Sequence, residues 1–321
     1  MFTNEEIEEL SSAVDNCKCA LIVTHKFPDL DAIGSSLALY HQLLKKGKRV
    51  TLYSPNRLDK QFYFLPGAKN FKTNILKVPT PDIIFALDSA RKERIDGHEE
   101  IDKYLSAPIF NIDHHHDNPK YGAKNIIKDI SSVGELLSHL FNELNWEITT
   151  PMASCLYAAI CFDTGRFAHS NVTEDTFKMA AQLKKSGADT SLIAEYMDEN
   201  KSLDDFKLIS LSTDRAVLNK DLNYVYTTIP IQHTRTSVKV IDFLRLLKGF
   251  EVILVFQELE RRKVKISVRS KKDTDVSAFA AKFGGGGHKK AAGILLLKSL
   301  EDSVNTIIPA LNEYLSDEPT E

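Results

Sequence analysis

The stretch Asn111-Ile112-Asp113-His114-His115-His116-Asp117-Asn118 places a carboxylate and three imidazoles directly after the apolar run Ala107-Pro108-Ile109-Phe110. An apolar run bounded by proline and followed by polar groups is typical of a buried strand that ends at a functional site. Ligands of open parallel sheets bind outside the carboxyl ends of the strands. The stretch therefore predicts a parallel α/β sheet with a site at that edge.

The same pattern recurs in three other segments, where an aspartate, or a histidine with two aspartates, closely follows an apolar run. These are His25-Lys26-Phe27-Pro28-Asp29-Leu30-Asp31, Ala86-Leu87-Asp88-Ser89 and Phe162-Asp163-Thr164-Gly165. Mixed imidazole and carboxylate ligands suit Mn²⁺, Fe²⁺, Co²⁺ or Zn²⁺. So many carboxylates in one place would repel one another unless cations neutralised them. Two divalent ions would do so and would also serve a phosphoryl displacement.

Each segment also has a purely structural interpretation. Asp31 could cap the helix that follows it, with Asp29 as a loop residue. Asp163-Thr164-Gly165 could be a helix C-terminus capped by Gly165, and His116 is interpreted as a loop residue. The four segments taken together favour the metal site.

Length and composition set the broad class. A chain of 321 residues predicts two domains. A net charge of −3 argues against a strongly cationic nucleic-acid-binding surface. The acidic N-terminus does not resemble a signal peptide, and no apolar run approaches the roughly 20 residues of a membrane span. Because the four cysteines suit neither a disulfide framework nor a CxxC zinc site, we expect a cytoplasmic protein without membrane contact.

Apolar periodicity predicts a βαβ opening, then helices, then a second sheet. The first half has expected strands at 19–24, 49–53, 82–87 and 108–112 and helices at 4–16, 32–46, 132–145, 151–162 and 173–187. The second half has expected strands at 222–229, 251–258 and 263–269 and helices at 237–248, 275–283 and 301–315. This pattern indicates a mixed α+β sheet. We expect domains at 1–190 and 213–321, joined by a helical linker at 191–212.

A second kind of chemistry is predicted for the run Gly284-Gly285-Gly286-Gly287-His288-Lys289-Lys290. Successive glycines let backbone N–H groups converge on an anion, although a flexible hairpin loop would also explain them. In the strand expected at 263–269, apolar and polar residues alternate. The polar face would let Arg269 bind a phosphate, whereas Lys265 is interpreted as solvated.

These motifs resemble those of the DHH phosphoesterase superfamily. The residues His25-x3-Asp29-x-Asp31-Ala32-Ile33-Gly34-Ser35, Asp88, Asp113-His114-His115 and Asp163-Thr164-Gly165 are similar to its four motifs, and Gly284–Gly293 is similar to the glycine-rich motif of the DHH-associated C-terminal domain. The motifs follow the family's order over nearly the whole chain, which is similar to the oligoribonuclease and 3′-phosphoadenosine-5′-phosphate phosphatase subgroup. The resemblance implies an α/β protein with an N-terminal parallel-sheet catalytic domain, a smaller mixed α+β substrate-binding domain, and an active site in the cleft between them.

The resemblance also implies roles for individual residues. His25, Asp29 and Asp88 would bind one Mn²⁺, and Asp31, Asp88, His114 and Asp163 a second, with Mg²⁺ or Co²⁺ as substitutes. His115 would act beside the scissile phosphate as an electrophile or general acid, and Asp113 would orient an imidazole. The substrate's phosphate or nucleotide would be held by Arg269, Gly285, Gly286, Gly287 and His288. His116 makes the signature a triple histidine, and we assign it no role.

The implied activity is Mn²⁺-dependent hydrolysis of short oligonucleotides, such as nanoRNA and pApA-type dinucleotides, to mononucleotides, and of 3′-phosphoadenosine-5′-phosphate (pAp) to AMP. Expected partners are short single-stranded RNA or DNA or small nucleotides, not long duplexes, and a homodimer is left open. An inorganic pyrophosphatase or polyphosphatase is the alternative enzyme, which the glycine-rich histidine motif disfavours. A catalytically silent nucleotide-binding module is disfavoured by the intact ligand positions.

Overall fold

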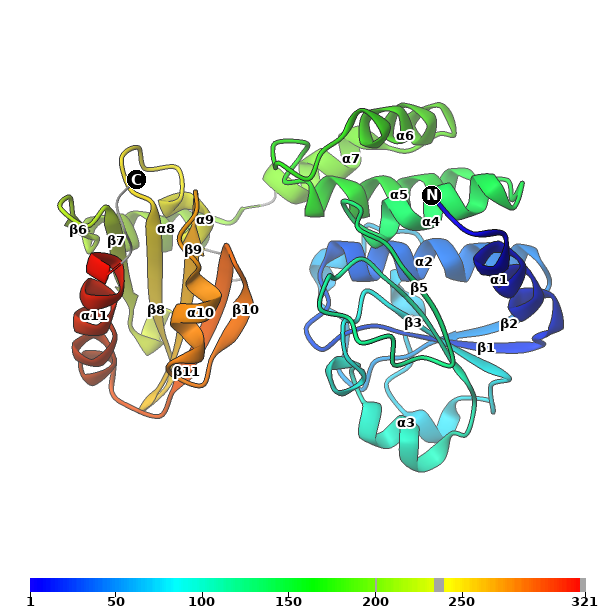
Figure 1. Cartoon of the computed structure of the whole chain (residues 1–321), viewed down its shortest axis with the longest axis horizontal. Coiled ribbons are helices and arrows are strands. Elements are labelled where there is room, and N and C mark those ends of the chain that lie inside the picture. Colours follow the sequence, from blue (N-terminus) through cyan, green and yellow to red (C-terminus); the bar gives the residue numbers. More distant parts are fainter. Residues whose placement is uncertain (200, 234–239, 318–321) are drawn as a thin grey trace. The chain divides into compact units, whose positions relative to one another are not determined.

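The computed structural model describes residues 1–199, 201–233 and 240–317, and the chain separates into two compact units (Figure 1). Unit 1 comprises Met1–Glu199 and unit 2 comprises Asn200–Glu321. The helical segment expected as a linker is shared between them. Helix α7 (Thr190–Ala194) contacts α5 of unit 1, and α8 (Leu203–Asp214) contacts the sheet of unit 2.

Unit 1 is built on a five-stranded sheet in the order β2-β1-β3-β4-β5, in which every pair is parallel. Its strands are β1 (Cys19–Val23), β2 (Arg49–Leu52), β3 (Ile83–Leu87), β4 (Ile109–Asp113) and β5 (Lys124–Ile127). This confirms the predicted parallel α/β sheet. The short edge strand β5 was not expected from the sequence.

Helices cover both faces of this sheet, which explains why β1 and β3 are apolar and buried at every position. One face packs against α1 (Asn4–Asn16), α2 (Leu30–Lys45), α4 (Val133–Glu143) and α5 (Thr150–Asp163). The other face packs against α3 (His98–Tyr104) and the 3₁₀ turn Ile75–Lys77. Further elements of unit 1 are α6 (Glu174–Lys185), the π-helical turn Glu195–Glu199 and the 3₁₀ turns Lys60–Phe62, Ala68–Asn70 and Lys92–Arg94.

The strand order determines where a ligand can bind. From β1 the chain passes to β2 on one side, and β3 then lies on the other side of β1. Sheets of this order bind ligands at the carboxyl ends of the two strands where the crossover direction reverses, here β1 and β3. Asp88 directly follows β3, and His25 is the second residue after β1.

Unit 2 contains a six-stranded mixed sheet in the order β10-β11-β9-β8-β7-β6, in which β7 and β8 are parallel and the other pairs antiparallel. The strands are β6 (Val217–Asn219), β7 (Tyr224–Ile229), β8 (Val252–Glu260), β9 (Lys263–Ser270), β10 (Gly286–His288) and β11 (Ala291–Leu296). The expected mixed α+β architecture is confirmed.

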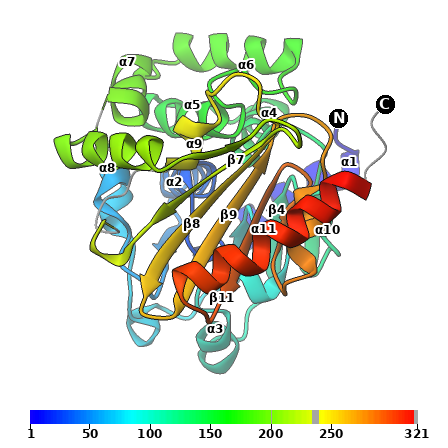
Figure 2. The ribbon, with the colours of Figure 1, turned by 90° about the vertical axis from the view of Figure 1, so that its left-hand side faces the viewer.

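The two faces of this second sheet pack against different helices. Helices α10 (Val276–Ala281) and α11 (Leu300–Asp317) lie over one face (Figure 2), where Val264, Ile266 and Val268 are buried. The other face packs against α8 and α9 (Val240–Leu244). The alternation of apolar and polar residues expected along β9 is therefore confirmed. Of the helix expected at 237–248, residues 237–239 lie outside the described residues.

Two local features differ from what the sequence indicated. Gly286 and Gly287 do not lie in a loop but belong to β10, which pairs antiparallel with β11. The segment after residue 230 contains a 3₁₀ turn, Ile231–His233, that the periodicity did not indicate. No helix among the described residues is long and apolar enough to cross a membrane.

Candidate metal centre

His25 enters the centre from the loop after β1, where it is buried and its backbone bridges to Ile95. Its Nδ1 donates a hydrogen bond to the carbonyl of Lys26 at 2.8 Å, which turns Nε2 towards the centre. Nε2 lies 3.5 Å from Asp88 Oδ2 and 4.0 Å from Asp29 Oδ2. Burial opposes a charge on this ring, but the hydrogen bond and charge of Asp88 outweigh it and raise the pKa of His25 to about 9.

Asp29 and Asp31 differ in their local roles. Asp29 is the N-cap of α2, because its Oδ1 accepts hydrogen bonds from the backbone amides of Asp31 and Ala32. The structural interpretation of Asp31 as the cap was therefore wrong. Asp31 lies in the first turn of α2 and is fully buried.

Asp31 is held by the N-terminus of another helix. Its Oδ2 accepts from Val133 N at 2.8 Å and its Oδ1 from Gly134 N at 2.9 Å, at the start of α4. A Cβ on Gly134 would lie 2.4 Å from Ala159 Cβ, so the close packing of α4 against α5 at this point requires glycine. Burial and then the charge of Asp88 raise the pKa of Asp31 to about 7, although the charge of His114 and the amide of Val133 partly compensate.

Asp88, at the end of β3, lies at the middle of the centre. Its Oδ1 is 3.4 Å from His114 Nε2 and 3.6 Å from His115 Nδ1, and its Oδ2 faces His25. It is buried and adopts the left-handed backbone region at φ 51°, which is uncommon outside glycine and typical of functional sites. Burial opposes its ionisation, but His114 and His25 hold its pKa well below the usual range.

His114 connects Asp88 to the carboxylate at the end of α5. Its Nδ1 donates to the carbonyl of Ile130 at 3.1 Å, and its Nε2 lies 3.3 Å from Asp163 Oδ2 and 4.0 Å from Asp31 Oδ2. Asp163 is the last residue of α5. The helix does end there, as the structural interpretation held, and the Asp163 carboxylate nevertheless faces the cluster.

The donor atoms form three groups in which all atoms lie within 4.8 Å of one another. The groups are His25, Asp29 and Asp88; Asp31, His114 and Asp163; and Asp88, His114 and His115. Asp88 Oδ1 is also buried without a hydrogen-bond partner among the described residues. A buried carboxylate oxygen in that state is costly unless a cation binds it. The donor set therefore fits divalent metal ions, with Asp88 common to two groups.

A hydrogen-bonded chain beside the cluster orients His115. Its Nδ1 donates to Asp113 Oδ1 at 2.7 Å, and Asn118 Nδ2 donates to Asp113 Oδ2 at 2.6 Å. Asn118 also donates to Asn111 Oδ1 at 2.8 Å. Burial opposes protonation of His115, but the hydrogen bond to Asp113 raises its pKa. His116 is exposed and 3.5 Å from the exposed Asp129, as expected of a loop residue.

The sequence did not reveal three contributions to this centre. Asn118 supports Asp113, Ile130 accepts from His114, and the first amides of α4 bind Asp31. Gly134 was the available signal, because glycine in the first turn of a helix is unfavourable and indicates close packing. Ser132 caps α4 by accepting from Glu135 N, but no capping box forms, because the Glu135 side chain accepts hydrogen bonds from Ser131 and Thr176 instead.

In unit 2, the structure places Arg269 on the polar side of β9, half-buried, with Nη1 donating to the carbonyl of Val268 at 3.1 Å. Gly285 and Gly287 have a packing reason to be glycine, since a Cβ on either would lie 2.3 Å from a carbonyl oxygen of β11. A Cβ on Gly286 would meet nothing within 4 Å. The side chain of His288 lies outside the described part of the chain, and its backbone pairs with Ala291.

Gly286 belongs to a row of small residues across the sheet of unit 2. It pairs with Gly293, which pairs with Ser267, and directly opposed residues share a face. Arg269 lies on the same face, two residues after Ser267. The backbone beside Arg269 is therefore left uncovered by large side chains along this row.

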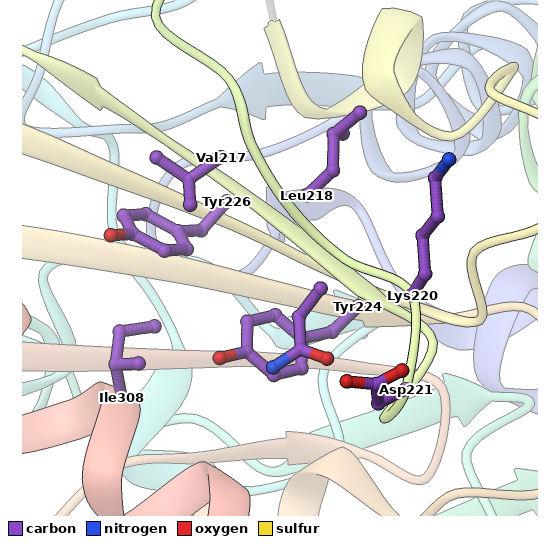
Figure 3. Close-up of a pocket in the computed structure, with 8 residues that line it drawn as sticks. Val217, Leu218, Lys220, Asp221, Tyr224, Tyr226 and Ile308 are labelled. Atoms are coloured by element: carbon purple, nitrogen blue, oxygen red, sulfur yellow. The ribbon is translucent and has the colours of Figure 1, made fainter.

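A separate hollow lies at the other edge of unit 2, between the β6–β7 hairpin and α11 (Figure 3). It contains none of the residues singled out from the sequence. Its lining residues are Val217, Leu218, Asn219, Lys220, Asp221, Tyr224, Tyr226 and Ile308.

Comparison with known proteins identifies two domains in the chain. Residues 20–160 match the model of the DHH family, N-terminal domain, and residues 221–317 match the DHHA1 domain. The chain is 29% identical to the bifunctional oligoribonuclease and PAP phosphatase NrnA of Thermus thermophilus, over 92% of this chain and 90% of that protein. It is 27% identical to NrnA of Bacillus subtilis, over 89% and 91% of the two chains.

Solved structures agree with this assignment. An exopolyphosphatase-related protein from Bacteroides fragilis superposes with a TM-score of 0.91 at 25% identity, over 98% of this chain and 97% of that one. The exonuclease RecJ bound to manganese shares the fold at a TM-score of 0.55 and 13% identity, over 98% and 94% of the two chains. The chain thus contains an N-terminal DHH domain followed by a DHHA1 domain.

Proposed function

We propose that this protein is a metal-dependent phosphoesterase that hydrolyses short oligonucleotides to mononucleotides and pAp to AMP. The observation that carries the proposal is the convergence of six imidazole and carboxylate side chains on Asp88 and its neighbours in unit 1. The names of the NrnA relatives, which describe oligoribonuclease and PAP phosphatase activities, support the substrate class.

The ligand sets extend the donor groups. We assign His25, Asp29 and Asp88 to one ion and Asp31, His114 and Asp163 to a second. Asp88, whose Oδ1 lies 3.4 Å from His114 Nε2, is the proposed ligand shared by both ions. Mn²⁺ is the proposed ion, and Mg²⁺ or Co²⁺ the substitutes, because imidazole nitrogen favours a transition-metal ion such as Mn²⁺ over the harder Mg²⁺. Bound divalent ions in such a site neutralise charge on the phosphoryl oxygens and lower the pKa of water.

His115 is the proposed proton donor to the leaving oxygen. Asp113 holds its Nδ1–H, so Nε2 is the nitrogen that can carry the transferred proton. The raised pKa of His115 favours the protonated ring that this role requires. Asn118 fixes Asp113 in turn, which makes Asn118 and Asp113 positioning residues.

Substrate binding is assigned to unit 2. Arg269 is the proposed phosphate ligand, since a guanidinium donates in parallel to two phosphate oxygens. Gly286, in the row of small residues, would let the substrate approach the backbone closely. We propose that the backbone amides of Gly285 and Gly287 also bind the substrate's phosphate. His288 is assigned to substrate binding from its place in the glycine-rich motif.

The charge and cysteine content limit the range of substrates and locations. With a net charge of −3 the chain has no large excess of cations with which to follow a long nucleic acid. We therefore propose short single strands or small nucleotides, not long duplexes, as substrates. Because Cys17, Cys19, Cys155 and Cys161 are all free and buried, we propose a reducing, cytoplasmic location.

The test is a side-by-side activity measurement with Mn²⁺. Substrates are a single-stranded RNA series from dinucleotide to about 24-mer, pAp, and inorganic pyrophosphate. We expect the highest kcat/KM for chains of roughly two to five nucleotides, because local phosphate contacts dominate binding. Preferential hydrolysis of pyrophosphate would favour the pyrophosphatase alternative. Metal binding without turnover of any of these would indicate a silent binding module.

A further inference from the structure

Phe27 combines three properties that are rarely found together. Its side chain is 93% exposed, the highest value among the exposed large hydrophobic residues that the structure describes. It adopts φ 56°, a left-handed conformation that is a genuine outlier for a bulky side chain. It also precedes Pro28, where the backbone normally stays extended. Single exposed apolar residues are common, but no other large one in the described chain has this backbone.

The strained position is held by its neighbours in the fold. On one side, His25 bridges to Ile95 and Lys26 N donates to the carbonyl of Arg94 at 2.7 Å. On the other side, the Asp29 side chain caps α2. The backbone is therefore fixed before and after Phe27, so the ring is displayed on a rigid loop. Strain that a structure maintains in this way occurs mainly at functional sites.

The position of Phe27 relative to the metal centre suggests what the ring contacts. It is two residues from His25 and two from Asp29, and two extended residues span at most about 7 Å. That is the scale of one nucleotide, so a substrate with its phosphate at these ligands would bring a base within reach of the ring. Lys26 and Arg94, on either side of the backbone contact, are both exposed cations.

We propose that Phe27 is a stacking platform for a nucleobase of the substrate, an inference that rests on the proposed function. Aromatic rings stack on every base because each base has a π-face. Phe27 would then contribute to binding without selecting a base sequence, and Lys26 and Arg94 would attract the adjoining phosphate. The platform would distinguish nucleotides from phosphate esters that lack a base.

The test uses Phe27→Asn, because asparagine tolerates the left-handed backbone and removes the ring. Phe27→Tyr retains the ring. Tyr104→Ala is the matched control, since it removes another exposed aromatic side chain from unit 1. All four proteins are assayed with Mn²⁺ on the dinucleotide pApA and on an analogue in which both nucleotides lack their bases. The melting temperatures of Phe27→Tyr and Tyr104→Ala should be close to that of the wild type, because both side chains are exposed. That of Phe27→Asn should be equal or slightly higher, because asparagine relieves the strained backbone.

We expect Phe27→Asn to raise KM for pApA about 10-fold, while KM for the base-free analogue changes less than about twofold. Phe27→Tyr and Tyr104→Ala should match the wild type on both. An equal increase for both substrates would show that Phe27 acts on the metal centre and not through a base, and an unchanged KM would exclude the platform. Either result overturns the proposal.

A binding measurement separates this inference from the proposed function. Calorimetric titration with Mn²⁺ compares AMP with ribose 5-phosphate, which differ only by the base. We expect wild type to bind AMP about 10-fold more tightly and Phe27→Asn to lose that difference. Absence of oligonucleotide hydrolysis by the wild type would contradict the proposed function alone, whereas equal affinities of wild type for the two ligands would contradict the platform.

Discussion

Unit 1 and unit 2 present their candidate residues in opposite ways. In unit 1 the candidate groups contact one another: His114 lies 3.4 Å from Asp88 and 3.3 Å from Asp163. In unit 2 each candidate is held by its own surroundings, as Arg269 is by the carbonyl of Val268. A metal ion needs its ligands preassembled within a few ångströms, so the fold itself reveals them. Groups that bind a substrate need only face the same ligand.

The electrostatics of the two units differ in the same way. Unit 1 gathers buried carboxylates whose pKa values move in opposite directions, up for Asp31 and down for Asp88. Such opposite shifts in pKa are typical of functional sites. In unit 2, burial lowers the pKa of Arg269, and the nearby charge of Asp242 partly offsets that effect. We propose that the chemistry takes place in unit 1, and we assign binding of the substrate's phosphate to unit 2.

The largest effect should follow removal of metal. An excess of chelator should abolish activity on every substrate, since all of the proposed chemistry depends on the donor groups of unit 1. Mn²⁺ should restore activity better than Mg²⁺ because of the imidazole ligands. Full activity in chelator, measured on pApA after dialysis, would contradict a role for metal ions in the reaction.

Asp88→Asn should have the next largest effect. Asparagine keeps the shape and tolerates the left-handed backbone at φ 51°, so the change removes mainly the shared charge. We expect kcat to fall about 1000-fold, which corresponds to about 4 kcal/mol. The rise in melting temperature that Mn²⁺ gives the wild type should also shrink.

The matched control for Asp88→Asn is Asp82→Asn. Asp82 precedes the same strand at the other end of the sheet, where it accepts from the amides of Lys18 and Cys19. The Asp82→Asn variant should be somewhat less stable than the wild type and should retain its kcat. A variant at Asp88 that turns over pApA within about 10-fold of wild type would contradict the shared-ligand assignment.

A smaller effect is expected for Asn118→Ala, which leaves Asp113 without one of its hydrogen bonds. We expect kcat to fall roughly 10-fold on pApA, whose leaving oxygen needs a proton, and little on a nitrophenyl ester, whose leaving group does not. Asn125→Ala is the control, because the Asn125 side chain exchanges hydrogen bonds with the backbone of Gly122 in a turn. Equal losses on the two esters would show that Asn118 supports the fold and not the orientation of His115.

Much of unit 1 could be predicted from the sequence because its signals are local. An apolar strand and the polar residue that follows it are neighbours in the chain, so His25, Asp88 and His114 could be placed at the same sheet edge. The contact of Asp31 with Val133 spans 102 residues and carries no local signature. The role of Asn118 likewise depends on how the loop after β4 folds back onto Asp113.

Unit 2 was less predictable for a physical reason. Four successive glycines have no strand propensity of their own, and β10 exists only because its backbone pairs with β11. The packing that makes Gly285 and Gly287 necessary is also absent from the local sequence. The alternation along β9 was predictable, because its period of two is visible in Val264, Ile266 and Val268.

The division of roles between the units is tested most directly by Gly286→Ala and Arg269→Ala, with Lys265→Ala as the control on the same strand. A methyl group on Gly286 enters open space, so the fold should tolerate it, and Lys265 is exposed. The measurement is KM and kcat of each variant for pApA and for a small nitrophenyl phosphodiester, with Mn²⁺. We predict that both test variants raise KM for pApA about 10-fold and change KM for the small ester by less than about twofold. Lys265→Ala should change neither KM. Equal damage to both substrates, or no change for pApA, would contradict the assignment of substrate binding to unit 2.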